Sequence, residues 1–183
     1  MDRICRIKVS LRHIRPPIWR RFEIAENVTM DALHDVLQIV MGWTDSHLHE
    51  FRVGTQRIGI ADGEDPMTID EKRVWLGRLL EDRARSMVYA YDFGDDWEHD
   101  VVVESLAEVD PKATYPRCLA GKRACPPEDC GGPHGYEELL RAFAEPDNQE
   151  LSEIREWARE IHPEKFDVDA INRRFKRLQS ASR

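Results

Sequence analysis

The chain has 183 residues, of which 41% are apolar and 34% are charged, and its formal net charge is −8. This length and apolar content suffice for one globular domain with its own hydrophobic core and no disulfide support. The longest apolar run, near Val36–Met41, is far shorter than the roughly 20 residues that a membrane span needs, so no membrane partner is expected. The first ten residues lack the apolar core of a signal peptide, and we therefore expect a cytoplasmic protein.

The basic side chains are concentrated at the two ends of the chain. Residues 1–21 hold seven basic side chains against one acid, and residues 171–183 hold five basic side chains and no acid. A basic rim of this kind is one way to meet a nucleic acid, because phosphate neutralisation supplies most of the affinity. The alternative is that these residues are the solvated outer faces of a strand and a helix, which the negative charge of the whole chain favours.

Two strands and a helix are predicted in the first quarter of the chain. Apolar and polar residues alternate over Cys5–Leu11, which is the period of a strand with one wet face. The pair Pro16-Pro17 ends this strand because proline has no N–H to donate, and apolar residues at 18, 22 and 24 mark an antiparallel partner. Helical spacing predicts a helix over Met30–Met41, with Thr29 as N-cap and Gly42 as its end.

The middle of the chain predicts further strands. The residues of His47–Val53 alternate as in a third strand, and the glycines and acids of Gly54–Asp70 indicate a strand end and a mobile loop. A short helical turn is expected at Val74–Leu80. Two more strands, Met87–Phe93 and Trp97–Glu104, are joined by a hairpin-type turn at 94–96.

The C-terminal third is predicted to be a loop followed by helices. Residues 110–135 are rich in proline and glycine, and they form an ordered loop only if something pins them. Helical stretches are expected at Tyr136–Ala144, Gln149–Glu160 and Asp167–Gln179. We therefore predict a single domain over 1–183, made of a sheet-and-helix core (1–109), the Cys/Pro/Gly loop (110–135) and a helical part (136–183). The fold class is α+β, with a single mixed or antiparallel sheet, a packed helix and a β-grasp-like core.

Three cysteines and a histidine form the first candidate site. Cys118, Cys125 and Cys130 are followed by His134, and three thiolates with one imidazole suffice for a tetrahedral zinc ion. Metal binding would also order the proline- and glycine-rich loop. With four protein ligands such a zinc would be structural, since no position remains for water. The spacing differs from that of common zinc knuckles, so three unrelated thiols are the alternative.

An acidic aromatic segment forms the second candidate site. Asp92, Asp95, Asp96 and His99 lie within Tyr91–Asp100, and carboxylate oxygens suit hard cations such as Mg²⁺, which serve phosphoryl chemistry. The alternative is a tight turn with acids that face solvent. The Asp-Phe-Gly tripeptide in this segment is no kinase signature, because the other kinase motifs are absent from the sequence.

Histidines form the third candidate site. Strand alternation predicts that His47 and His49 project to the same side, and His99 could join them in a three-histidine site of the kind that activates water. The alternative is ordinary polar pairing across strands. His34 lies near the apolar stripe of the predicted helix and is interpreted as a residue at the boundary of the core.

Four long segments resemble the plasmid pRiA4b ORF-3-like family. In the family's order they are RPPIWRRFEI, LHDVLQIVMGWTDSHLHEFRVG, YAYDFGDDWEHDVVVE and YPRCLAGKRACPPEDCGGPHGYEELL. The resemblance spans nearly the whole chain and implies a compact α+β fold, with an association with plasmids and mobile elements. Some members carry labels of transposon resolvases or insertion-element passengers. The sequence does not support resolvase chemistry, because Ser10 is its only echo of a serine recombinase. Family variation at 130 and 134 leaves room for a site that pairs Cys118 and Cys125 with His49 or His99.

Two functions are predicted as alternatives, and the sequence leaves open whether the protein is an enzyme. The first is a non-enzymatic binding module for a protein or nucleic-acid partner, because aromatic anchors beside arginines suit such recognition. The residues of its groove would be Trp19, Arg20, Trp43, Asp45, Tyr91, Asp92 and Trp97. The second is a metal-dependent hydrolase that uses the acidic segment for metal and His47 or His49 as base.

Overall fold

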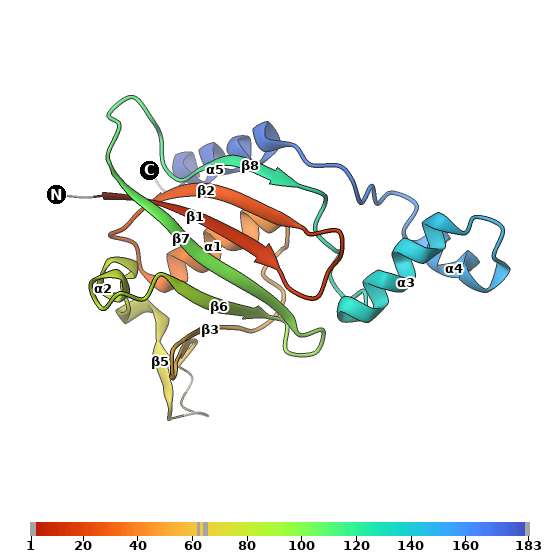
Figure 1. Cartoon of the computed structure of the whole chain (residues 1–183), viewed down its shortest axis with the longest axis horizontal. Helices are drawn as coiled ribbons and strands as arrows, with labels where there is room; N and C mark the ends of the chain where they lie inside the picture. The colour runs from red at the N-terminus through yellow and green to blue at the C-terminus, as the bar shows by residue number, and fades with distance from the viewer. Residues whose placement is uncertain (1–2, 62, 64–65, 182–183) are drawn as a thin grey trace.

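One eight-stranded mixed sheet organises the protein in the computed structural model, which describes residues 3–61, 63 and 66–181, with side chains through 178 (Figure 1). The strand order is β5-β4-β3-β6-β7-β1-β2-β8. The strands are β1 (Arg3–Leu11), β2 (Trp19–Ala25), β3 (His49–Val53), β4 (Gln56–Gly59), β5 (Thr68–Asp70), β6 (Ser86–Tyr91), β7 (Trp97–Glu108) and β8 (Arg117–Lys122). The helices are α1 (Met30–Met41), α2 (Leu76–Glu81), α3 (Gly132–Ala144), α4 (Ser152–Trp157) and α5 (Val168–Ala181), with 3₁₀ turns η1 (Glu71–Arg73) and η2 (Gln149–Leu151).

Nearly all strand pairs in this sheet are antiparallel. β1 is central and pairs with β2 on one side and β7 on the other, and β4 with β5 is the parallel pair. The predicted fold class, α+β with a single mixed sheet and a packed helix, is confirmed. α1 crosses one face of the sheet, and α5 packs on β8 and α1 on the same side (Figure 1).

The ends of α1 follow the predicted signals in part. The helix spans the predicted residues, and Gly42 takes the left-handed conformation (φ 101°) that ends it, with its N–H on Gln38 O at 2.8 Å. Thr29 stands at the N-cap position, but its side chain makes no capping hydrogen bond. The Asp31 carboxylate instead accepts a hydrogen bond from Ala32 N in the first turn.

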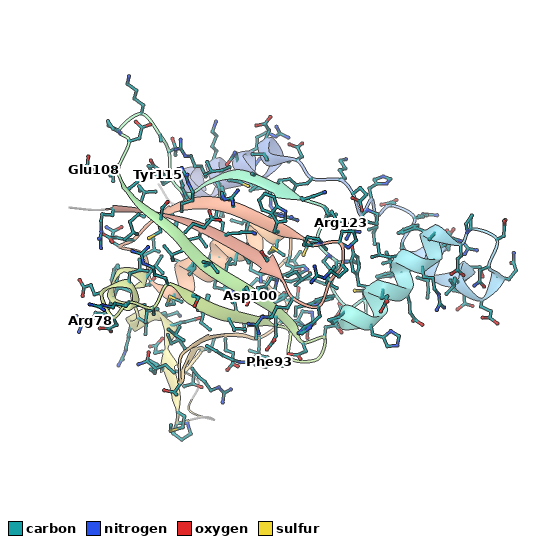
Figure 2. The ribbon with its side chains drawn as sticks, in the orientation of Figure 1. Arg78, Phe93, Asp100, Glu108, Tyr115 and Arg123 are labelled. Carbon is teal, nitrogen blue, oxygen red and sulfur yellow. The ribbon has the colours of Figure 1, made fainter. Side chains whose placement is uncertain are left out.

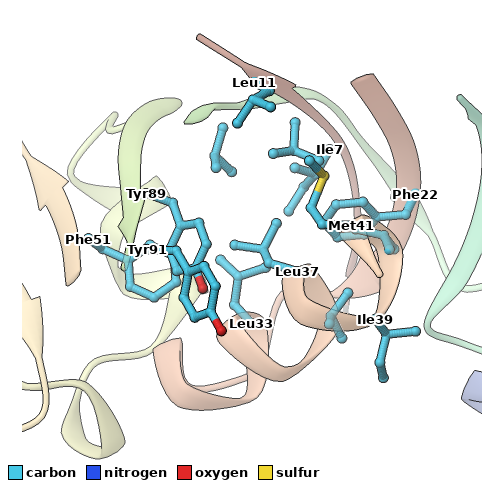
Figure 3. Close-up of a cluster of buried hydrophobic side chains, with 14 of the residues drawn as sticks. Ile7, Leu11, Phe22, Leu33, Leu37, Ile39, Met41, Phe51, Tyr89 and Tyr91 are labelled. Atoms are coloured by element: carbon cyan, nitrogen blue, oxygen red, sulfur yellow. The ribbon is translucent and has the colours of Figure 1, made fainter. Parts of the chain in front are cut away.

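The hydrophobic core lies between α1 and the sheet. Figure 3 shows Leu33 and Leu37 of α1 pointing at the sheet, with the rings of Tyr89 and Tyr91 on one side of them. Ile7, Phe22 and Met41 fill the other side (Figure 3). These side chains are fully or almost fully buried, so packing of apolar surface supplies the main driving force for the fold.

Two segments predicted as loops contain strands. Residues 54–70 include β4 and β5, and the Cys/Pro/Gly loop includes β8, which pairs with β2 from Trp19↔Lys122 to Glu23↔Arg117. Both predictions missed strands because these are short pieces at the sheet edges, where pairing with a neighbour matters more than local alternation. The irregular part of the 110–135 loop is therefore smaller than predicted.

A side chain of α5 covers the outer edge of β8. Asn172 Oδ1 accepts a hydrogen bond from Cys118 N at 2.8 Å, and Asn172 Nδ2 donates one to Cys118 O at 3.0 Å. The amide thus pairs with both backbone groups of one edge residue, as the next strand of a sheet would. This contact fixes α5 along the edge strand.

The helices α3 and α4 lie beyond the end of the sheet, at the right of Figure 1. Arg123 is buried where this helical pair meets the sheet, between the two in Figure 2. Its Nε donates to Glu164 Oε1 and its Nη1 donates to Pro16 O, both at 2.7 Å. One guanidinium therefore joins the loop after β1 to the chain that returns from α4. No helix among the described residues has the length and apolar character to cross a membrane.

Candidate functional site

A polar cavity opens beside α1 where β3 and η1 meet. Its volume is about 400 Å³. Five carboxylates and one lysine line it together with two imidazoles, so an acidic pocket surrounds the imidazoles. The polar lining residues are Asp31, His34, Asp35, Asp45, His49, Asp70, Glu71 and Lys72.

The two imidazoles in this pocket are stacked and each meets a carboxylate. The rings of His34 and His49 lie with centroids 3.5 Å apart and planes 7° apart. His34 Nε2 is 2.9 Å from Asp45 Oδ1, and His49 Nε2 is 2.7 Å from Glu71 Oε2. Because an ionised carboxylate only accepts hydrogen bonds, both Nε2 atoms carry the proton.

A closed ring of hydrogen bonds fixes the His34 side of the pocket. Asp45 N donates to Gln38 Oε1 at 2.9 Å, and Gln38 Nε2 donates to the Tyr89 hydroxyl at 2.9 Å. The hydroxyl lies 2.8 Å from His34 Nδ1 and donates to it, since His34 Nε2 already holds its proton toward Asp45. Burial lowers the pKa of His34, and the neighbouring His49 lowers it further. The imidazole is therefore neutral in this network.

Local structure explains how these residues meet. His34 and Gln38 stand one turn apart on α1 and so face the same way. Asp45 takes a left-handed backbone conformation (φ 58°), which turns the loop after α1 back over the helix. Asp70 caps η1 by accepting a hydrogen bond from Lys72 N, and this turn carries the buried Glu71 under His49.

His49 keeps one buried nitrogen without a partner. Its Nε2 is bound to Glu71, whereas no hydrogen-bond partner for the buried Nδ1 lies among the described residues. A buried polar atom without a partner is costly, and in native structures it requires an explanation such as a ligand. The ring thus has an unused lone pair, and it belongs to a residue that lines an acidic cavity.

The cluster brings three possible metal ligands close together. His34, Asp45 and His49 each offer one ligand atom, and these atoms all lie within 4.8 Å of one another. With metal–ligand distances of about 2.0–2.2 Å, neighbouring ligand atoms around a tetrahedral ion lie roughly 3.3–3.6 Å apart. The N···O distance of 2.9 Å between His34 and Asp45 is that of a hydrogen bond, and one of the two stacked rings would have to turn before both imidazole lone pairs meet one ion.

A second group of possible ligands is less complete. His47 Nε2 lies 3.6 Å from Asp92 Oδ2 and 3.3 Å from Asp129 Oδ1. The other oxygen of Asp92 accepts hydrogen bonds from Gly94 N and Asp95 N, and Asp129 is largely exposed. Alternation predicted that His47 and His49 project to the same side of one strand. In the structure β3 begins at His49, so His47 precedes the strand and the two do not share a strand face.

Carboxylates of the β6–β7 turn accept hydrogen bonds from backbone N–H groups. Asp92 caps the turn, and Asp96 N donates to Asp92 O at 2.7 Å. Asp95 Oδ2 accepts a hydrogen bond from Gly131 N at 3.2 Å, which links the turn to the cysteine loop. The groups of three or more mutually close ligands in the described chain do not include Asp95, Asp96 or His99. These observations favour the structural interpretation of the segment.

The three histidines of the predicted water-activating site lie apart. His47 faces Asp92 and Asp129, and His49 stacks on His34. His99 is fully buried against the edge of Trp43, with ring centroids 5.1 Å apart, and its Nδ1 donates to Tyr89 O. Within the described residues, no mutually close ligand group contains all three.

The cysteines show no close ligand cluster among the described residues. Cys118 Sγ lies near backbone oxygens of Arg21 and Ala120, and Cys130 Sγ lies near Gly132 O. Neither described ligand group contains a cysteine or His134. Burial raises the pKa of Cys118 to about 11 and that of Cys130 to about 12. Zinc at Cys118, Cys125, Cys130 and His134 stays a prediction.

Most aromatic residues of the predicted groove are in the core. Trp43, Tyr91 and Trp97 are 3%, 0% and 1% exposed, so they pack inside and do not line an open groove. Trp19 is partly exposed on the outer face, where Lys8 and Arg21 stack on its ring.

The basic N-terminal residues are paired with acids on the sheet. Arg12 bonds Asp100, labelled in Figure 2, at 2.6 Å, and Arg21 bonds Glu104 at 2.7 Å. These ion pairs agree with the alternative in which the N-terminal basic residues lie on the solvated outer face of a strand.

The sequence did not single out Glu71, Tyr89 and Gln38, which form the hydrogen-bond network around the two imidazoles. Glu71 and Tyr89 are distant in sequence from His34, and only the fold brings them together. One signal was available: His34 and Gln38 are two polar residues one turn apart beside an apolar stripe, which indicates a buried polar contact.

Comparisons with known proteins agree with this architecture. A family model described as plasmid pRiA4b ORF-3-like protein matches residues 3–173. The uncharacterized protein y4hQ of Sinorhizobium fredii (strain NGR234) is 38% identical over 183 residues, covering 97% of this chain and 90% of the relative. A crystal structure of a protein of unknown function from Methanosarcina mazei Go1 is 35% identical with a TM-score of 0.86, and covers 92% of this chain and 97% of that chain.

Proposed function

The chain belongs to the plasmid pRiA4b ORF-3-like family, and for this member of it we propose a binding function in which the acidic pocket holds a divalent transition-metal ion. The ligands are His34, Asp45 and His49, and Glu71 orients the His49 ring. The observation that carries the proposal is the gathering of their three ligand atoms within 4.8 Å of one another.

The donor set selects the class of ion. Imidazole nitrogens with carboxylate oxygens suit zinc and neighbouring first-row metals, whereas Mg²⁺ and Ca²⁺ prefer oxygen alone. Five carboxylates against one lysine give the pocket an excess of negative charge that a dication would neutralise. The Glu71–His49 hydrogen bond is the outer contact by which proteins commonly hold a metal-binding histidine in position.

Metal binding requires a shift of protons. An ion at His34 Nε2 displaces the proton that now lies toward Asp45. The imidazole would then carry its proton on Nδ1 and donate it to the Tyr89 hydroxyl, 2.8 Å away, and that hydroxyl would have to turn its own O–H away from the ring. The low pKa of His34, caused by burial, keeps this ring free of a second proton and so available to metal.

Cobalt titration of metal-free protein tests the proposal and separates the two predicted sites. Co²⁺ bound by nitrogen and oxygen lacks the near-ultraviolet thiolate band that a cysteine site produces. We expect about one equivalent of Co²⁺ or Zn²⁺ without that band. Binding should be lost in His49→Gln and retained in Cys125→Ser.

The exposed His162 provides a matched control. His162→Gln removes a histidine far from the pocket lining and should leave metal binding unchanged. Metal that remains in His49→Gln, or a wild-type protein that binds no metal, would contradict the pocket as the site. A thiolate band lost in Cys125→Ser would instead support the cysteine loop.

A metal-dependent hydrolase is the second candidate, and Asp35 is the observation that favours it. Asp35 lines the same cavity, and burial raises the pKa of its carboxyl, with Asp45 and Asp31 raising it further. A carboxyl with a raised pKa beside a metal ion suits proton transfer. We expect turnover of a phosphoester to disappear in Asp35→Asn while metal stays bound. Absence of phosphoester turnover by the wild-type protein with every metal tested would rule out this candidate.

A further inference from the structure

A second cavity lies at the opposite end of α1 from its first turn. Its volume is about 440 Å³, and it is bounded by the end of α1, the 124–128 segment and the start of α5. The walls are largely apolar, with Met41, Trp43, Phe166 and Ile171 among them. Pockets of a few hundred cubic ångströms with apolar walls and a few polar groups are the usual size for small-molecule ligands.

A buried arginine stands at the base of this cavity. Arg20 of β2 is 2% exposed. Its Nε donates to Val40 O at 2.8 Å, and its Nη1 donates to Trp19 O and Lys122 O at 2.8 and 3.0 Å. These bonds satisfy a free carbonyl in the last turn of α1 and join it to β8. Arg20 Cζ also lies 4.4 Å from the centre of the Phe166 ring.

The positive charge of Arg20 lacks a counter-charge. Among the described residues no carboxylate forms an ion pair with it, and no acceptor meets its Nη2. The nearby thiols do not supply negative charge, because burial raises the pKa of Cys118 to about 11 and raises that of Cys125 further. A guanidinium is always charged at neutral pH, and a buried charge calls for a partner of opposite sign.

Two further cations at the same cavity are unpaired. Lys165 and Arg174 line its rim, are exposed, and form no ion pair with any described residue. The two acids of the lining accept hydrogen bonds from neighbouring groups but keep their negative charge, and Asp167 interacts electrostatically with Lys165. Glu128 accepts hydrogen bonds from Thr44 and Tyr91, and Asp167 caps α5 by accepting one from Ala170 N. In a protein of net charge −8, the lining of this cavity thus holds three cations, Arg20, Lys165 and Arg174, against two carboxylates.

We propose that this cavity binds a small organic oxyanion with an apolar body, whose charged group meets Arg20 Nη2 between Lys165 and Arg174. The apolar walls would hold the body of the ligand, and the buried guanidinium would fix the orientation of its carboxylate or phosphate. This site is separate from the metal pocket and does not depend on it.

Titrations followed by NMR of the intact chain test this inference. The probes are straight-chain carboxylates from acetate to octanoate and benzoate, with hexanamide as the neutral match and hexyl phosphate as the phosphate match. We expect carboxylates to shift the Trp43 indole N–H and the amides near Phe166 at millimolar concentrations, and hexanamide to bind at least about tenfold more weakly. Tighter binding of hexyl phosphate than of hexanoate would identify the oxyanion as a phosphate.

Arg20 itself supports the structure, and its substitution could affect folding. The variants are therefore made at the exposed rim of the cavity. Lys165→Gln and Arg174→Gln should each weaken the binding of hexanoate about threefold, and the double variant should weaken it about tenfold. Lys176→Gln removes the same charge from α5 outside the cavity and should change nothing. Equal binding of hexanoate and hexanamide, or no shift with any carboxylate, would overturn the inference. His49→Gln should bind hexanoate like wild type, which separates this result from the metal test.

Discussion

Buried imidazoles occur in two different settings in this protein. His34 and His49 lie beside carboxylates that can stabilise a proton or share a metal ion. His99 has Tyr89 O as the acceptor of its Nδ1–H, and its buried Nε2 has no partner in the part of the chain that the structure describes. Burial lowers the pKa of His99 to about 4, so this ring is neutral at physiological pH. Its place in the interior makes protonation incompatible with the packed core.

We predict that His99 makes the protein sensitive to acid. In the unfolded chain a histidine titrates near pH 6.5, whereas His99 in the folded protein titrates near 4, so the unfolded state binds more protons between these values. Stability should be full above about pH 6.5 and fall by about 3 kcal/mol as the pH drops to about 4. Urea unfolding across this range should show a shallower pH dependence in His99→Gln and an unchanged one in His162→Gln. An equal slope in wild type and His99→Gln would contradict the assignment.

At the scale of elements, local patterns predicted the centre of the sheet better than its edges. β1 and α1 have clear periods of two and 3.6 residues, and both were predicted nearly to their ends. β4, β5 and β8 are short, and β8 contains Gly121 within a proline- and glycine-rich segment, so no local period marks them. Their pairing depends on neighbours that only the complete fold supplies.

The candidate site was harder to predict than the fold for the same reason. Its residues come from α1, the loop after it, β3, η1 and β6, and no spacing along the chain encodes these approaches. Arg20 was foreseen as a binding residue on a groove rim, but alternation with Ile18 and Phe22 places it on the buried side of β2. An arginine on the apolar face of a strand is a signal that sequence alone provides.

Gly121 of β8 gives room to Phe166, and we predict that a methyl group there disturbs this contact. A Cβ at Gly121 would lie 2.5 Å from Phe166 Cζ and 2.9 Å from Trp19 O. Gly121→Ala should therefore move the ring from Arg20 and lower the free energy of unfolding by about 1–3 kcal/mol. A double-mutant cycle in urea unfolding provides the check: the cost should shrink in a Phe166→Leu background. An equal cost in both backgrounds would mean that Phe166 is not the cause.

At the scale of the whole molecule, polar contacts and buried apolar side chains together attach the α3–α4 pair to the sheet. Arg123 bonds both Glu164 and Pro16 O, and Ala124 N donates to Pro163 O at 2.8 Å beside it. The chain leaves the sheet at 123 and returns near 163, so both crossings pass this one place. Arg123 is therefore one of several contacts that hold the pair, together with the Asp95–Gly131 hydrogen bond and the buried Tyr136 and Leu139 of α3.

We predict that Arg123→Gln loosens this attachment without unfolding the sheet. The variant loses an ion pair and leaves Pro16 O without its donor, a local loss of about 1–3 kcal/mol. Hydrogen exchange at the Ala124 amide should speed up roughly 5- to 100-fold, while amides of β1 keep their protection. Arg78→Gln, a change on the exposed face of α2 (Figure 2), should leave both unchanged. Unaltered exchange at Ala124 would show that other contacts hold the helices.

The Asn172 amide has a consequence for how copies of this protein can meet. An uncovered edge strand invites another chain to add itself to the sheet, which is a common route to polymers and fibrils. Here the backbone of Cys118 already has both partners from Asn172, and the opposite edge, β5, is only three residues long. A neighbouring molecule therefore finds no long ladder to extend at either side. We therefore expect strand addition between copies of this protein to be disfavoured at both edges of the sheet.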